Sequence, residues 1–131
     1  MSSPLVSVLV VEDDPEINAL VGAYVELCGY EYRAALDGAA ALAEAARRTP
    51  SAVILDLMLP DIDGFEIARR LRAIPDMMHT PIIVLSAMGD ADSRQRSQAS
   101  GADEHLTTPF DPDEFMQVLK SRVGGSPSTP K

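Results

Sequence analysis

The chain has 131 residues, a length that favours one compact domain, and 46% of them are hydrophobic. That share excludes wholesale disorder and a low-complexity class. The 20 acidic and 11 basic residues leave a net charge of −9, so we expect this chain to bind no nucleic acid directly and no anionic membrane. The only lysines are Lys120 and Lys131, so arginine supplies all positive charge ahead of residue 120.

The N-terminus has neither the basic stretch nor the long apolar run of a secretory signal, and no apolar run approaches membrane-spanning length. We therefore expect a soluble, cytoplasmic protein. The single cysteine, Cys28, can form no internal disulfide and is expected to be a small buried residue on an apolar helix face.

The first strand and helix are predicted from adjacent patterns. Residues 5–11 form a nearly unbroken β-branched run, which is typical of a strand covered on both faces. Asp14 is predicted to cap a helix that begins at Pro15 and ends at Gly29. The apolar positions that recur at helical spacing in it are Ile17, Leu20, Val21, Tyr24, Val25 and Cys28.

The same alternation of short apolar runs and helical patterns continues through the chain. Because each parallel connection needs a long crossover, this alternation predicts a parallel sheet with helices on both faces. We expect further strands at residues 30–35, 52–55, 81–85 and 104–107, and further helices between Asp37 and Pro50, at residues 65–74 and after Asp111.

Residues 89–100 stand where the fourth helix of this alternation belongs, but their only apolar side chains are Ala91 and Ala99. A helix without an apolar stripe gains little from docking on a sheet. We therefore predict that this segment is the most mobile part of the domain.

Polar side chains follow three of the predicted strands. Glu12 and Asp13 follow the first strand, Asp56 ends the third and Ser86 ends the fourth. In open α/β sheets, ligands bind outside the carboxyl ends of the strands. Because clustered carboxylates repel one another, a hard cation such as Mg²⁺ fits here, with room left for a phosphoryl oxygen. A carboxylate beside such a cation can attack an activated phosphoryl group.

The alternative is that each acid caps the helix that follows it, where the helix dipole favours a negative charge. We expect this simpler role for Asp14 and Asp61.

Four segments match, in order and in spacing, the signature blocks of a known family. The segments are VLVVEDDP (residues 8–15), VILDLMLPDIDGFEI (53–67), PIIVLSA (81–87) and GADEHLTTPFDPDEF (101–115). Over residues 5–122 the chain resembles the receiver domain of bacterial two-component response regulators. The resemblance implies a flavodoxin-like, doubly wound (βα)5 fold of the α/β class, with five parallel strands in the order 2-1-3-4-5. It places the receiver domain at residues 4–123, and residues 124–131 are then either a flexible tail or the start of a linker to an effector domain.

The resemblance also implies roles for individual residues. Asp56 matches the phosphoacceptor, which takes a phosphoryl group from a sensor histidine kinase or a histidine phosphotransfer protein. Glu12 and Asp13 match the acidic pair that binds Mg²⁺ together with Asp56, and Met58 offers its backbone carbonyl as a further ligand. Ser86 matches the hydroxyl that binds the phosphoryl group and draws in the following loop.

Two positions depart from the family pattern. Thr108 stands where the family carries a lysine that pairs with the phosphoryl group, and a threonine hydroxyl cannot neutralise charge. His105 stands at the position of an aromatic switch residue, where it is either a half-exposed strand residue or a signalling one. The resemblance also implies that the peptide bond between Thr108 and Pro109 is cis.

These residues leave two functions open. In the first, Asp56 is phosphorylated and the change reaches a downstream protein or effector domain through the face formed by the fourth helix, fifth strand and fifth helix, with weakened switching. In the second, the domain is an interaction module that works without phosphorylation. A phosphatase that turns over small substrates is a weaker third reading, because the chain has no cap domain. The oligomeric state stays open, and a homodimer is compatible with the sequence.

Overall fold

The computed structural model describes residues 6–87 and 91–123, so the proposed tail at residues 124–131 lies outside the described residues. The boundaries of residues 4–123 for the domain stay a prediction. The elements are β1 (Ser7–Val11), α1 (Pro15–Leu27), β2 (Glu31–Ala35), α2 (Gly38–Arg47), β3 (Ala52–Asp56), α3 (Gly64–Ala73), a short 3₁₀ turn η1 (Pro75–Met77), β4 (Ile82–Ser86), α4 (Ala91–Ala99), β5 (Glu104–Thr107) and α5 (Pro112–Val123).

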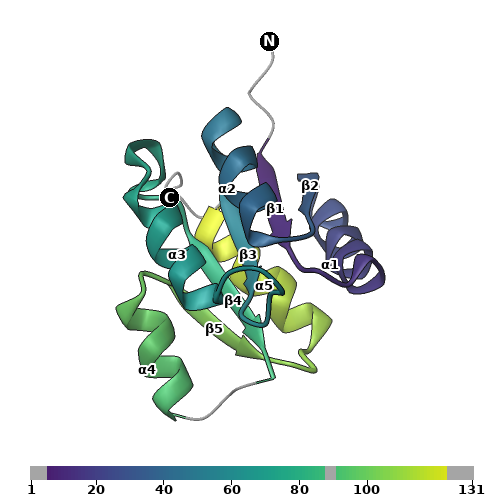
Figure 1. Cartoon of the computed structure of the whole chain (residues 1–131). Coiled ribbons are helices and arrows are strands. Elements are labelled where there is room, and N and C mark those ends of the chain that lie inside the picture. Colours follow the sequence, from purple (N-terminus) through teal and green to yellow (C-terminus); the bar gives the residue numbers. More distant parts are fainter. Residues whose placement is uncertain (1–5, 88–90, 124–131) are drawn as a thin grey trace.

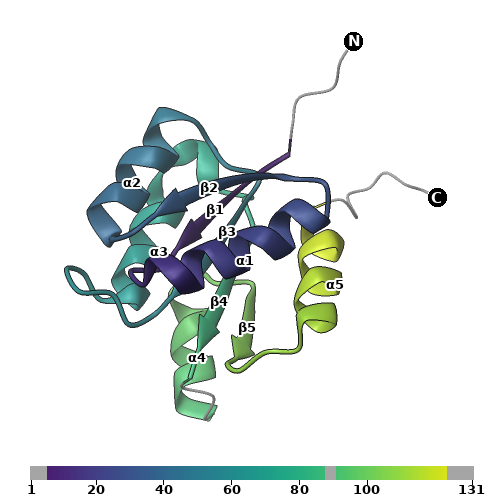
Figure 2. The ribbon, with the colours of Figure 1, turned by 90° about the vertical axis from the view of Figure 1, so that its right-hand side faces the viewer.

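The five strands form one parallel sheet in the order β2-β1-β3-β4-β5, which confirms the predicted flavodoxin-like fold. Helices α1 and α5 cover one face of the sheet, and α2, α3 and α4 cover the other (Figures 1 and 2). Successive strand side chains alternate between the two layers, so Leu9 and Val11 pack under α2 and α3 while Val8 and Val10 pack under α1 and α5. Because all five strands are parallel, their carboxyl ends, which carry the polar residues, lie at the same edge of the sheet.

Helix α1 buries part of its predicted apolar face: Val21 and Val25 are buried, and Tyr24 and Cys28 pack partly buried against the core. Ile17 and Leu20 are 46% and 51% exposed, whereas Asn18 and Gly22 are buried. Gly22 is needed because the Tyr32 ring lies against it, and a Cβ there would come within 2.4 Å of that ring. Cys28 is half-buried against the core rather than fully buried, which corrects its expected position.

Helix α4 forms although its sequence lacks an apolar stripe. Ser93, Ser97 and Ser100 recur at helical spacing and are buried. The Ser100 hydroxyl donates to the backbone oxygen of Ser97 at 2.7 Å, and the Ser97 hydroxyl lies 2.8 Å from Nδ1 of His105 on β5. The helix therefore turns small polar side chains inward, and one of them, Ser97, contacts β5 through His105. The mobility expected for residues 89–100 stays a prediction, and residues 89 and 90 lie outside the described part of the chain.

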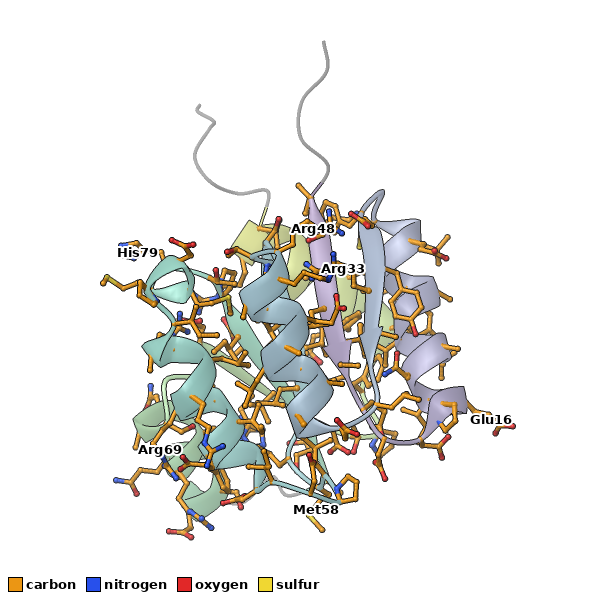
Figure 3. The ribbon with its side chains drawn as sticks, turned by 45° about the horizontal axis from the view of Figure 1, so that its top comes forward. Glu16, Arg33, Arg48, Met58, Arg69 and His79 are labelled. Atoms are coloured by element: carbon orange, nitrogen blue, oxygen red, sulfur yellow. The ribbon has the colours of Figure 1, made fainter. Side chains whose placement is uncertain are left out.

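Buried charge is held at the opposite end of the sheet from the polar strand ends. Arg33 on β2 is 6% exposed, and its guanidinium contacts the Glu44 carboxylate of α2 at 3.0 Å. His79 lies at the edge of the molecule opposite Met58 (Figure 3).

No helix within residues 6–87 and 91–123 combines the length and the apolar character needed to cross a bilayer.

Candidate functional site

Three carboxylates meet at the carboxyl ends of β1 and β3. These strands are neighbours in the sheet, with Val11 opposite Leu55, so Glu12 and Asp13 are brought beside Asp56. One oxygen from each carboxylate lies within 4.8 Å of the others. The convergence that the sequence predicted is therefore present, and all three donors are of the hard type that suits Mg²⁺.

Burial and the neighbouring carboxylate charges raise the pKa values of Glu12 and Asp56 and make these two acids harder to ionise. Burial, followed by the charge of Asp56, raises the pKa of Glu12 to about 7, although the backbone N–H of Asp14 donates to Glu12 Oε2 at 3.0 Å and opposes this rise. Burial is also the main cause of the raised pKa of Asp56, with the charge of Asp13 adding to it. The Met58 N–H donates to Asp56 Oδ1 at 3.2 Å and works against that rise. A bound cation would relieve the repulsion.

Asn18 holds the end of β1 in place, and sequence reasoning missed it. Its side-chain amide nitrogen is 3.1, 3.0 and 3.2 Å from the backbone oxygens of Val10, Glu12 and Ala35. The Tyr32 hydroxyl donates to the Asn18 side-chain oxygen. An amide among the apolar positions of the first helix was the available signal, because a buried amide must find partners.

The loop from Leu57 to Asp63 is tied to α2. Asp61 was expected to cap the helix that follows it, but its two carboxylate oxygens accept from the backbone N–H groups of Gly38 and Ala39 at 2.9 and 3.0 Å. These bonds hold the pKa of Asp61 below its usual value, and Asp63 caps α3 instead. Asp61 takes this role because the loop passes beside the start of α2, whose N–H groups have no partners within the helix.

Gly64 closes the same loop tightly. A Cβ at this position would come within 2.4 Å of the Leu57 backbone. The backbone of Met58, whose carbonyl is the expected further metal ligand, is thus held between fixed points next to Asp56. The Met58 side chain itself is exposed at the edge of the molecule (Figure 3).

The ends of β4 and β5 complete the edge. Ser86 is buried and lies opposite Thr107, and the Thr108 N–H donates to the Ser86 backbone oxygen at 2.8 Å. The Thr108–Pro109 bond is cis, as expected. Thr108 and Asp56 line the same pocket.

His105 faces α4 rather than the carboxylates. It is partly buried, its Nδ1 contacts Ser97, and Arg94 donates to its backbone oxygen at 3.1 Å. Arg94 also donates to the Thr107 hydroxyl at 3.0 Å. Residues of α4 are therefore bonded directly to β5.

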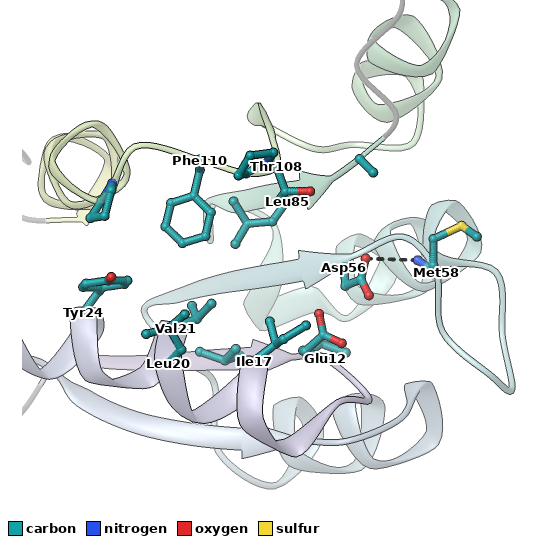
Figure 4. A pocket seen from close by; sticks show the side chains of 15 residues that line it. Glu12, Ile17, Leu20, Val21, Tyr24, Asp56, Met58, Leu85, Thr108 and Phe110 are labelled. Carbon is teal, nitrogen blue, oxygen red and sulfur yellow. Dashed lines mark hydrogen bonds between the residues drawn. The ribbon is translucent and has the colours of Figure 1, made fainter.

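A pocket of about 450 Å³ extends from the carboxylates between α1 and the segment that follows β5 (Figure 4). Glu12 and Asp56 lie at one end of it, and Tyr24 and Phe110 lie at the other (Figure 4). The walls between these ends are mainly aliphatic. The lining residues are Val10, Val11, Glu12, Ile17, Leu20, Val21, Tyr24, Asp56, Met58, Leu85, Ala87, Thr108, Pro109, Phe110 and Pro112.

Residues 8–120 match the family model described as "Response regulator receiver domain". The chain belongs to this family. It is 37% identical over 114 residues to the DNA-binding dual master transcriptional regulator RpaA of Synechocystis, a match that covers 87% of this chain and 47% of the relative. The chain therefore spans about half the length of the curated relatives it matches.

Solved receiver structures agree with this assignment. Chemotaxis protein CheY4 of Vibrio cholerae superposes with a TM-score of 0.85 at 32% identity, covering 92% of this chain and 99% of that one. The receiver domain of the sensor histidine kinase PA1611 from Pseudomonas aeruginosa superposes with a TM-score of 0.84 at 29% identity, covering 92% and 99%. That structure has a magnesium ion coordinated in its active-site cleft. Receiver domains are signalling domains of two-component systems, and the resemblance seen in the sequence is thereby confirmed.

Proposed function

We propose that this receiver domain accepts a phosphoryl group on Asp56 from a sensor histidine kinase or a histidine phosphotransfer protein. The observation that carries the proposal is the position of the Asp56 carboxylate within 4.8 Å of ligand oxygens of Glu12 and Asp13. A nucleophilic carboxylate next to a cation site has the two elements that phosphoryl transfer to an aspartate needs.

The residues present suit Mg²⁺. Asp13, Asp56 and the Met58 carbonyl would be direct ligands, with Glu12 acting through water, and this oxygen set leaves positions for waters and a phosphoryl oxygen. Mg²⁺ would supply positive charge that neutralises the carboxylates and the phosphoryl oxygens of the transition state.

The chain itself orients the nucleophile. The Met58 N–H donates to Asp56 Oδ1 and so orients the carboxylate, whose other oxygen would attack phosphorus. In that step the Asp56 O–P bond forms as the bond between phosphorus and the histidine nitrogen of the donor breaks, and the imidazole leaves with the electron pair. The Ser86 hydroxyl would then donate to a phosphoryl oxygen.

Thr108 gives this site a weaker link between phosphorylation and conformation. It offers a hydroxyl where charge neutralisation is needed, and the loss of one charge-assisted hydrogen bond costs about 1.5 to 3 kcal/mol. Phosphorylation is therefore expected to occur with a reduced structural response at Ser86 and His105. The output surface would be α4, β5 and α5, facing a downstream protein, an effector domain or a second copy of the chain.

The test is incubation with Mg²⁺ and a small-molecule phosphodonor, followed by intact mass measurement. One added phosphoryl group is expected in the wild type and none in Asp56→Asn. Asp92→Asn, an exposed change on α4, is the matched control and should be modified like the wild type. An unmodified wild-type mass with several donors would refute the proposal.

A second candidate is an interaction module that works without phosphorylation. Thr108 favours it, because none of the described residues lining the pocket beside Asp56 is basic. A partner affinity that changes neither with phosphodonor nor in Asp56→Asn would support this function over the first.

A further inference from the structure

The apolar pocket beside the carboxylates has the character of a ligand site. Its volume of about 450 Å³ lies within the range of small-molecule pockets, and aliphatic and aromatic side chains form most of its wall. Its two carboxylates, those of Glu12 and Asp56, lie together at one end, away from Tyr24 and Phe110 (Figure 4). Such an arrangement fixes the orientation of a ligand that has one polar end and one apolar end.

The charge at that end selects the polar group of the ligand. Glu12 and Asp56 contribute carboxylates, and the described part of the lining contains no basic side chain to pair with them. An ammonium group would pair with the ionised form of these acids and donate hydrogen bonds to them, whereas an anion would be repelled from them in the metal-free chain.

The far end of the pocket selects the body of the ligand. The rings of Tyr24 and Phe110 stand edge to face, with their centres 6.0 Å apart. Ile17 and Leu20 project from α1 at the rim and remain about half exposed, so an occupant would remove apolar surface from water. An aromatic or alkyl group of a few carbons suits this end.

We propose that the pocket binds a small amphiphilic amine, with its ammonium on Glu12 and Asp56 and its apolar body between α1 and Phe110. Charge complementarity at one end and apolar enclosure at the other distinguish this occupant from an anionic metabolite. The inference does not depend on phosphorylation of Asp56, because it needs only the carboxylates and walls of the unmodified chain.

The test uses three probes on the full ¹⁵N-labelled chain in a buffer with a metal chelator. Phenethylamine is the ligand probe, 2-phenylethanol is its neutral counterpart, and ethylamine carries the charge without the apolar body. Amide chemical shifts at Glu12, Leu20 and Phe110 should move saturably with phenethylamine, with a dissociation constant of about 1 mM for a probe of this size. Each of the other two probes should bind at least about tenfold more weakly.

Two matched substitutions on α1 separate the pocket from general surface binding. Leu20→Gln removes part of the wall and should weaken phenethylamine about threefold or more. Leu27→Gln changes a 73% exposed leucine of the same helix that does not line the pocket, and it should leave the affinity unchanged.

A third variant, Glu12→Gln, should weaken phenethylamine while leaving 2-phenylethanol unaffected. Equal affinity for the amine and the alcohol, perturbations centred away from the pocket, or no saturation would each overturn the proposal. In those cases the pocket would have another occupant, such as a partner protein.

Discussion

The side-chain amide of Asn18 donates to the backbone oxygen of Glu12 at 3.0 Å and thereby joins helix α1 to the acidic edge of the sheet. The same nitrogen lies 3.2 Å from the Ala35 oxygen at the end of β2. One buried amide thus fixes the ends of two strands relative to α1. The backbone that carries Glu12 is therefore held beside Asp56 by the protein's own hydrogen bonds.

Replacing Asn18 tests that role. Asn18→Ala leaves the backbone oxygens of Val10 and Ala35 without this donor, so the free energy of unfolding should fall by about 2 to 3 kcal/mol. Mg²⁺ affinity should fall as well, because Glu12 loses its support. Urea unfolding and Mg²⁺ titration measure the two effects, and Gln98→Ala, an exposed amide on α4, is the control. Normal Mg²⁺ affinity in a folded Asn18→Ala variant would contradict a positioning role.

The raised pKa of Glu12 predicts a pH-dependent stability. Because this pKa is about 7 in the folded chain and has its ordinary value of 4.5 in the unfolded chain, the contribution of Glu12 to stability is fully present below about pH 4.5. It is lost as the pH rises through about 7. The wild type should therefore lose stability relative to Glu12→Gln between about pH 5 and about pH 8, and chemical unfolding of both proteins across that range measures the difference.

Mg²⁺ should reverse this trend. It binds the ionised carboxylates, so the stabilisation by Mg²⁺ is expected to increase as the pH rises through about 7 and to shrink below it. Asp92→Asn should follow the wild type in both series. A stability difference between wild type and Glu12→Gln that stays constant with pH would contradict a raised pKa.

The contact between Ser97 and His105 predicts how α4 is held. Ser97→Ala removes the hydroxyl that lies 2.8 Å from His105 Nδ1, and it should cost about 1 kcal/mol of stability. Amide exchange within α4 should become faster while exchange within β1 and β3 stays unchanged. Gln95→Ala, an exposed change on the same helix, is the control. In the wild type, α4 amides that exchange as slowly as those of the sheet would refute the mobility predicted for residues 89–100.

The strand pattern and the carboxylate cluster could be predicted because they depend on short-range signals. Apolar runs such as residues 8–11 define strands that are covered on both faces, and parallel order brings their carboxyl ends together. The proximity of Glu12 and Asp56 could therefore be predicted without any knowledge of side-chain contacts.

The residues whose burial or role differs from the prediction depend instead on which strand or helix each helix packs against. Leu20 has the apolar character of a core residue, but α1 turns Asn18 and Gly22 inward. The Asn18 amide nitrogen lies within hydrogen-bonding distance of three backbone oxygens, and Gly22 admits the Tyr32 ring. For α4, the missing apolar stripe gave no hint that serines would pack against β5. Asp61 likewise caps a helix that precedes it in the chain, a contact that local sequence cannot encode.

Thr108→Lys tests amine binding in the pocket and the proposed phosphoryl transfer in one variant. A lysine stem at this position would run along the wall that ends on Glu12 and Asp56, and its ammonium would favour their ionised forms. The pKa of Glu12 should then fall below about 7, phenethylamine should lose affinity, and donor-dependent phosphorylation should become at least about tenfold faster. Thr49→Lys adds the same charge at an exposed position after α2 and should change none of the three. Faster phosphorylation with unchanged amine binding would separate the two proposals, because the new ammonium would then reach the phosphoryl group without entering the pocket.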